Sequence, residues 1–121
     1  MASYIVLFKC PDAVVETRAK RFRIAAGLYA YVGSCGSSCW GRVGRHLKRS
    51  GKKFWHADYL PCSPVAAAVL GAEERELAAL MAKSFSYVEG FGSSDDESSP
   101  SHLFRLSSPL DLTRVVSAAS H

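Results

Sequence analysis

GLYAYVGSCGSSCWGRVGRHLKR, residues 27–49, predicts a strand, a loop and a helix in succession. Residues 27–33 form a short apolar run bounded by glycines, and the two-residue period of a strand puts Tyr29 and Tyr31 on the same face. Residues 34–38 are rich in Gly and Ser, which favours a loop. A tight connection should therefore join the strand to the helix.

The expected helix has an apolar stripe and a basic remainder. Ser37 or Ser38 can cap its first turn. Trp40, Val43 and Leu47 recur at the i, i+3, i+7 spacing of one helix face, which we expect to pack on the core. Outside this stripe, on the helix or just after it, are seven side chains that would form a basic surface: Arg42, Arg45, His46, Lys48, Arg49, Lys52 and Lys53.

Two runs before residue 27 have the composition of strands. Residues 3–9, SYIVLFK, are rich in strand formers, and Pro11-Asp12 follows with turn chemistry. Residues 14–24 alternate loosely, which suits a strand with one exposed basic face. That face would carry Arg18, Lys20, Arg21 and Arg23. Together with residues 27–33, these runs predict a small, mostly antiparallel, three-stranded central sheet.

The second half of the chain predicts further strands and a second helix. Residues 54–60 alternate as a strand with Phe54, His56 and Asp58 on one side, and residues 65–70 form a small apolar strand or buried segment. Residues 72–74 open a helix, and acidic residues suit the positive end of its dipole. The buried face of this helix would contain Leu77, Leu80, Met81 and Phe85.

The C-terminal region predicts a loop, an edge strand and a tail. Residues 90–101 are mainly Gly, Ser, Asp and Pro and read as a flexible loop, and residues 102–106 give a last edge strand. Residues 107–121 are weakly patterned and suit either a short docking helix or a frayed end. We therefore expect one α/β (α+β) domain over residues 1–106, with helices flanking the sheet, followed by this tail.

Composition limits the class of protein. The 121 residues are 48% hydrophobic and 21% charged, which is typical of one globular domain. No run approaches the roughly 18 apolar residues of a membrane helix, so we expect a soluble, cytoplasmic protein. The formal net charge is +4, and its clustering favours an anionic partner. The chain lacks Asn and Gln, a depletion that is typical of proteins from thermophiles.

Three other kinds of site are weaker. The loop at 36–41 has the spacing of a phosphate-binding loop, but Arg42-Val43 replaces the required Lys-Ser/Thr pair. Cys35 and Cys39 could join Cys62 or His46 in a zinc site, although no second close pair anchors it, so free thiols or a disulfide are favoured. His56 and Asp58 could act as a hydrolase pair, but no nucleophile is indicated by spacing.

Several sequence blocks occur in a characteristic order after Tyr4: GLYAYVGS at 27–34, RVGRHLKR at 42–49, FWHADYL at 54–60, ERELA at 74–78, and FGSSD with PSHLF at 91–104. In this order the chain resembles the GIY-YIG nuclease superfamily, in particular its small stand-alone Uri branch, over about residues 3–106. Ala2-Ser3-Tyr4 stands where the name motif has Gly-Ile-Tyr, and Val32 replaces the Ile of the second motif. The branch often has a cysteine-containing segment where Asp96, Glu97, Ser98 and Ser99 stand here.

The resemblance implies a set of site residues. Tyr4 would be the general base, with its pKa of about 10 depressed by a metal ion and by Arg42. Arg42 would grip the phosphate as a two-pronged donor, and His46, one turn later, would assist the phosphate or a proton transfer. Tyr31 would orient water or substrate. Gly33 would let the backbone pass close to the next helix, and second-tier candidates are Ser34, His56, Asp58, Ser94, Asp95 and His102.

Glu74 would hold the metal ion, Mg²⁺ or Mn²⁺. Helical spacing alone does not separate it from Glu73 or Glu76, and the alignment to the superfamily selects Glu74. One carboxylate suffices, because Mg²⁺ keeps several of its waters.

The function implied is a metal-dependent endonuclease acting on DNA, with RNA not excluded, directed to a branched or damaged structure as in DNA repair. Arg21, Arg23, Arg45, Lys48, Arg49, Lys52 and Lys53 would contact the nucleic-acid backbone. A non-catalytic nucleic-acid-binding module on the same scaffold is the alternative, and a redox or zinc protein is a third class. The protein would act as a monomer or a homodimer.

Overall fold

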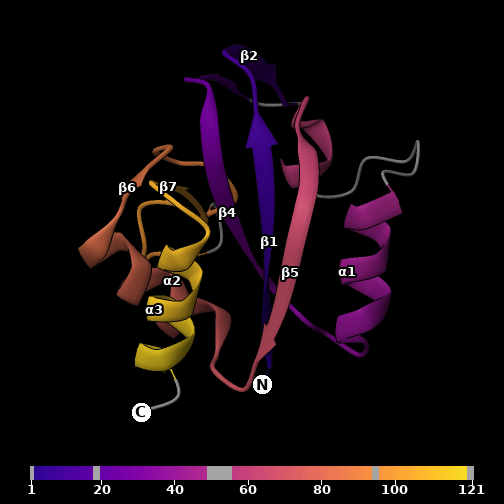
Figure 1. The fold of residues 1–121 in the computed structure, drawn as a ribbon, viewed down its shortest axis with the longest axis vertical. Helices are drawn as coiled ribbons and strands as arrows, with labels where there is room; N and C mark the ends of the chain where they lie inside the picture. Colours follow the sequence, from indigo (N-terminus) through magenta and orange to yellow (C-terminus); the bar gives the residue numbers. More distant parts are fainter. Residues whose placement is uncertain (1, 18–19, 49–55, 94–95, 120–121) are drawn as a thin grey trace.

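The fold is built around one antiparallel sheet. The computed structural model describes residues 2–17, 20–48, 56–93 and 96–119. The sheet has the strand order β5-β1-β4-β7-β6, and Figure 1 shows β1 between β4 and β5. Its strands are β1 (Ser3–Cys10), β4 (Gly27–Ser34), β5 (Ser63–Leu70), β6 (Ser86–Tyr87) and β7 (Leu103–Leu106). The α+β class and the extra strands toward the C-terminus are confirmed, but the central sheet has five strands, not three.

The predicted second strand, residues 14–24, is a hairpin of two short strands. β2 (Ala13–Glu16) and β3 (Arg21–Ile24) pair only with each other and form a separate two-stranded sheet. Val15 and Phe22 are both buried and paired in register although they are seven residues apart, so the phase of the alternation changes between the two strands. The pattern of residues 14–24 is loose, and we had interpreted it as one strand. In the central sheet, β5 takes the place beside β1 that this run was expected to fill.

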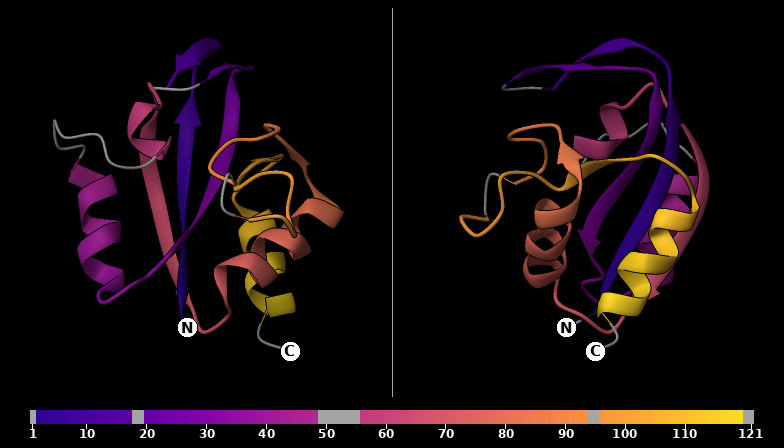
Figure 2. Two further views of the ribbon diagram at one scale, coloured as in Figure 1. Left: turned by 180° about the vertical axis from the view of Figure 1, so that it is seen from behind. Right: turned by 60° about the vertical axis from the view of Figure 1, so that its left-hand side comes forward.

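Two layers cover the two faces of the sheet. The hairpin, α1 (Cys39–Lys48) and the 3-10 helix η1 (His56–Tyr59) share a core with the face of β1 that carries Tyr4, Val6 and Phe8. The opposite face packs against α2 (Glu74–Ser84) and α3 (Leu110–Ala119), which Figure 2 shows side by side. Because both faces are covered, residues 3–8 of β1 are all buried.

Helix α1 is rotated about its axis relative to the expected orientation. Val43 is buried as predicted, but Trp40 is 69% exposed and Leu47 is 45% exposed. The second buried residue of the helix is His46, which was expected on the basic outer surface. The His46 side chain lies among buried aromatic rings, including that of Tyr4, and its Nε2 atom is within hydrogen-bond distance of the Tyr4 hydroxyl. This contact offsets part of the cost of burying the imidazole.

The edge strand predicted at 102–106 is β7, but it pairs with both β4 and β6 and is therefore not at the edge of the sheet. Three further segments complete the comparison with the expected elements. The strand predicted at 54–60 is wrong where described, because residues 56–59 form η1; residues 54 and 55 lie outside the described residues. The tail is a helix, α3, whose Val115 joins the core beneath α2. Helix α2 buries Leu77 and Met81 as expected, but Leu80 is only half-buried, and Phe85, also half-buried, follows the end of the helix.

The four cysteines form two disulfides. Cys10 at the end of β1 is bonded to Cys62 before β5, and Cys35 after β4 is bonded to Cys39 at the start of α1. The second bond closes the C-x3-C spacing that had also been weighed as half of a zinc site. Among the described residues, none of the helices has the length and apolar character needed to span a bilayer.

Candidate active site

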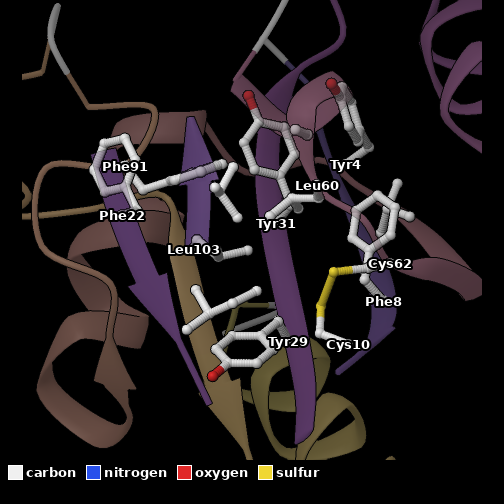
Figure 3. Packing of buried hydrophobic residues seen from close by; sticks show 14 of the residues in the cluster. Tyr4, Phe8, Cys10, Phe22, Tyr29, Tyr31, Leu60, Cys62, Phe91 and Leu103 are labelled. Atoms are coloured by element: carbon white, nitrogen blue, oxygen red, sulfur yellow. A yellow bond between two sulfur atoms is a disulfide. The ribbon is translucent and has the colours of Figure 1, made fainter. Parts of the chain in front are cut away.

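Tyr4 and Tyr31 bring two hydroxyl groups to one end of the buried core. Their ring centroids are 6.5 Å apart, and Figure 3 shows both hydroxyls at the same end of the hydrophobic cluster. Tyr4 lies opposite Gly33 in the β1–β4 register, and a Cβ on Gly33 would lie 2.2 Å from a ring carbon of Tyr4. Gly33 therefore makes room for the Tyr4 ring, whereas we had expected it to allow a close approach to the next helix.

His46 is the partner of Tyr4. Its Nε2 atom lies 2.8 Å from the Tyr4 hydroxyl oxygen, and the ring is fully buried. The rings of Tyr4, Tyr31 and Phe8 surround it, with centroids 5.4, 5.7 and 6.4 Å from that of His46. Helix α1 thus places the His46 imidazole in the core, in contact with both tyrosine rings.

Asp58 continues this chain of polar groups on the other side of His46. Its Oδ1 lies 3.7 Å from His46 Nδ1, and its Oδ2 accepts a 2.7 Å hydrogen bond from Arg45 Nη2. The Asp58 side chain is 8% exposed and that of Arg45 is 18% exposed, so the ion pair is largely shielded from water. Arg45, which we had expected to contact nucleic acid from the surface, instead holds Asp58 beside His46.

Arg42 is fixed by the loop that precedes its helix. Its Nη1 donates to the backbone carbonyl of Ser34 at 2.8 Å, and the guanidinium crosses Gly36, where a Cβ would lie 2.4 Å from Nη2. Gly36 has a φ of +55°, a conformation that few other residues adopt readily. Ser38 caps the helix, since its Oγ accepts from the Gly41 amide at 3.0 Å.

Glu74 reaches the site from the first turn of α2. Its Oε2 lies 3.6 Å from Nδ1 of His102, and the other ring nitrogen of His102, Nε2, lies 2.7 Å from Asp96 Oδ2. His102 is thus held between two carboxylates, and its side chain is 3% exposed. Asp96 is held in turn by the amide of Ser98 at 2.9 Å.

Burial and charge set the pKa values of the two tyrosines. Burial raises the pKa of Tyr4 well above its ordinary value of 10, and Arg42 opposes this while Glu74 raises the pKa further. The pKa of Tyr31 is also raised well above 10, first by burial and then by Tyr4 and Glu74. Arg42 and Glu74 therefore both act on the same two hydroxyls, although they come from helices on opposite faces of the sheet.

A family model matches residues 3–121, nearly the whole chain, and its description is "Domain of unknown function DUF123". The chain belongs to the DUF123 family. The match extends through α3, so the DUF123 domain includes the C-terminal helix. No curated protein and no solved structure gives a significant match to the chain.

A divalent cation at Glu74 would be held by one protein carboxylate, next to the His102 ring whose Nδ1 lies 3.6 Å from Oε2. The Glu74 side chain is 29% exposed, so a hydrated ion can reach its oxygens. Mg²⁺ commonly binds through one or two carboxylates and retains several waters, and Mn²⁺ accepts the same oxygen ligands. In the part of this DUF123 domain that the structure describes, no group of three or more His, Cys, Asp or Glu side chains could hold a metal ion. Water and substrate would therefore supply the other ligands.

The other predicted site residues divide by position. Arg21 and Arg23 lie on the exposed face of the hairpin, and Lys48 is exposed at the end of α1. Ser34 contributes its carbonyl to Arg42. Five further candidates lie outside the described residues: Arg49, Lys52, Lys53, Ser94 and Asp95. The backbone of His56 is described as part of η1, but its side chain is not.

Sequence reasoning missed two contributors to the site. Asp96 was noted only as a departure from the superfamily pattern. An acidic residue six positions before His102 was the sequence feature that could have indicated the pairing of these two side chains. Gly92 has a φ of +71°, and a Cβ there would lie 3.3 Å from the Tyr31 ring. Its place in the FGSSD block was the signal for a close backbone approach.

Asp96→Asn should destabilise this DUF123 domain in a pH-dependent way. Burial alone would lower the pKa of His102, but its hydrogen bonds to Glu74 and Asp96 outweigh burial and raise the pKa above 6.5. A raised folded-state pKa means that the stabilisation is full below about pH 6.5 and is lost as the pH rises through the folded-state value. We expect the variant to lose roughly 2 kcal/mol of unfolding free energy at pH 6 and less at pH 9, measured by urea denaturation. An equal or larger loss at pH 9 would contradict this account.

Proposed function

We propose that this DUF123 chain is a divalent-metal-dependent endonuclease that hydrolyses phosphodiester bonds in nucleic acid, with DNA as its main substrate. The observation that carries the proposal is the joining of Tyr4, His46 and Asp58 in one chain of polar groups, with Arg42 and Glu74 acting on the same tyrosine. A phosphodiesterase needs a proton acceptor for water, a cation for the phosphate and a metal ligand. These five residues supply one of each, with Asp58 in support.

The proton acceptor is best described as the Tyr4–His46 pair. Burial raises the pKa of Tyr4 and Arg42 lowers it only in part, so without a bound metal ion the phenol is protonated near neutrality. In the tautomer that carries its proton on Nδ1, on the side of Asp58, His46 Nε2 would accept the Tyr4 hydrogen. As the water oxygen bonds to phosphorus and the bond from phosphorus to the leaving oxygen breaks, the water proton passes to the Tyr4 oxygen and the Tyr4 proton passes to His46. The leaving oxygen departs as an alkoxide and takes a proton from solvent. Asp58 then stabilises the imidazolium, which has gained one positive charge.

The phosphate would be held by two positive groups, the Arg42 guanidinium from α1 and a cation bound by Glu74 of α2, two helices on opposite faces of the sheet. Arg42 provides a planar, permanently charged donor that matches two phosphate oxygens. A cation bound by Glu74 would neutralise charge on the phosphate and polarise the leaving oxygen. Tyr31, at the centre of this group, would orient water or substrate by its hydroxyl. His102 and Asp96 position Glu74 from behind.

A non-catalytic nucleic-acid-binding module remains the second candidate, favoured by the exposed arginines of the hairpin. A panel of flap, bubble, abasic, uracil-containing, single-stranded and duplex DNA, and of RNA, separates the two. We expect cleavage of at least one substrate with Mg²⁺ or Mn²⁺, and no cleavage in EDTA. Gel retardation of the same substrates without any cutting would favour the binding module instead.

A further inference from the structure

The Cys35–Cys39 disulfide spans the turn between β4 and α1. Cys35 directly follows β4 and Cys39 is the first residue of α1, so the bond ties the end of the strand to the beginning of the helix. Two backbone hydrogen bonds fold the same turn. The Cys35 amide donates to the Ala2 carbonyl at 3.2 Å, and the Ser38 amide donates to the Cys35 carbonyl at 3.1 Å. Residues 36–38 are therefore enclosed in a covalent ring.

This turn also holds Arg42, the proposed phosphate ligand. The Arg42 guanidinium donates to the Ser34 carbonyl at 2.8 Å, and it lies against Gly36, where a Cβ would be 2.4 Å from Nη2. The backbone amide of Arg42 donates to the Ser38 carbonyl at 3.3 Å. Residues 34–38 thus contact both the backbone and the side chain of Arg42, so the position of this turn determines where the guanidinium lies.

The two disulfides differ in how well they resist a reductant. Cys10 and Cys62 are both buried, at 5% and 8% exposure, whereas Cys39 is half-buried at the beginning of α1. Thiol–disulfide exchange needs access of a thiolate to sulfur. Cys10 and Cys62 are also 52 residues apart, against 4 for Cys35 and Cys39. A cross-link over a longer loop stabilises the fold more, and by linkage the fold protects that bond more against reduction.

Reduction of Cys35–Cys39 would release the turn without removing the helix. A dithiol reductant supplies two electrons and two protons, the S–S bond breaks, each cysteine becomes a thiol, and the reductant becomes a disulfide. Helix α1 keeps its Ser38 cap and its buried Val43, so it should remain folded. Residues 34–38 would then be held to the helix by non-covalent contacts alone. The Arg42 guanidinium would lose part of its fixed support.

We propose that Cys35 and Cys39 are positioning residues for Arg42, and that reduction of their disulfide by a dithiol slows phosphodiester cleavage. The effect on cleavage rests on the proposed function. The order in which the two disulfides are reduced, and the release of residues 34–38, do not depend on it.

The first experiment needs no substrate. The native protein is equilibrated with mixtures of reduced and oxidised dithiothreitol, the thiols are alkylated, and the modified cysteines are located by mass spectrometry. We expect a state in which Cys35 and Cys39 are alkylated while Cys10 and Cys62 remain bonded, with faster amide hydrogen exchange across residues 35–42. Reduction of Cys10–Cys62 first, or unchanged hydrogen exchange across residues 35–42, would overturn the proposal.

The second experiment measures cleavage without reductant. The double substitution Cys35→Ser with Cys39→Ser should lower kcat about tenfold with little change in KM, because misplacing a catalytic group by about 1 Å costs up to about a hundredfold. The matched control is Cys10→Ser with Cys62→Ser, assayed below its own unfolding temperature. It should keep the native kcat and still lose activity at the dithiothreitol ratio that reduces Cys35–Cys39.

An Arg42→Lys background separates a positioning role from a general structural one. If the disulfide acts through Arg42, adding Cys35→Ser and Cys39→Ser to Arg42→Lys should lower kcat by no more than about twofold further, since coupled changes are not additive. A further loss of about tenfold in that background, or a rise in KM with kcat unchanged, would contradict the proposal. If the native protein cleaves no substrate, the nuclease proposal fails, while alkylation and hydrogen exchange still decide whether the disulfide holds residues 34–38.

Discussion

Glu74→Gln is expected to lower the rate of DNA cleavage about a thousandfold, because the amide keeps the shape of the side chain but removes its charge. A metal ion that stabilises the reacting phosphate contributes several kcal/mol, and roughly 4 kcal/mol corresponds to a factor of about a thousand. The measurement is the single-turnover cleavage rate with saturating Mg²⁺. Glu74 is partly exposed at the start of α2, so the variant should still fold.

Glu76→Gln is the matched control for this prediction. Glu76 lies two residues further along the same helix, is exposed, and does not act on the pKa of either tyrosine. We expect its cleavage rate to be native. Equal rates in Glu74→Gln and Glu76→Gln would exclude Glu74 as the metal ligand.

Arg42→Lys is expected to lower kcat about a hundredfold while the charge of the site is unchanged. Lysine lacks the planar fork that matches two phosphate oxygens, and it cannot reproduce the Nη1 bond to the Ser34 carbonyl together with a second donor. Removing one preorganised donor from a transition state costs roughly a hundredfold to a thousandfold in kcat. The measurement is kcat and KM on the substrate that the panel identifies.

The control for Arg42→Lys is Arg114→Lys, an exposed substitution on α3 that should leave kcat and KM native. A rise in KM with kcat unchanged would contradict the prediction, because it would mean that Arg42 binds the ground state and the transition state equally. Thermal unfolding of both variants shows whether any loss of rate reflects loss of the fold.

The strands that carry the tyrosines were predictable because their apolar runs are short and bounded by turn residues. Residues 3–9 and 27–33 match β1 and β4 within one residue at each end. The hairpin at 13–24 was missed, although Val15 and Phe22 are seven residues apart and face the same core, which one continuous strand would not allow. The alternation of residues 14–24 is too loose for this change of phase to stand out.

The site was only partly predictable for a related reason. Helical spacing pairs Arg42 with His46 but does not show that His46 lies inside, because imidazole is polar and its burial depends on Tyr4, 42 residues away. The Arg45–Asp58 ion pair depends in the same way on η1, which periodicity had suggested was a strand. Whether a polar side chain faces solvent or the core depends on partners that are distant in the sequence, and a single sequence does not show which distant residues come into contact.

The most direct test of the central claim is a Mg²⁺ titration of DNA cleavage by the native protein, with Glu74→Gln prepared in parallel to reveal any contaminating nuclease. The account predicts no cleavage in EDTA, a rate that rises and saturates with Mg²⁺, and no comparable rise in the variant. Cleavage that persists in EDTA, or that rises equally with Mg²⁺ in both preparations, would contradict it.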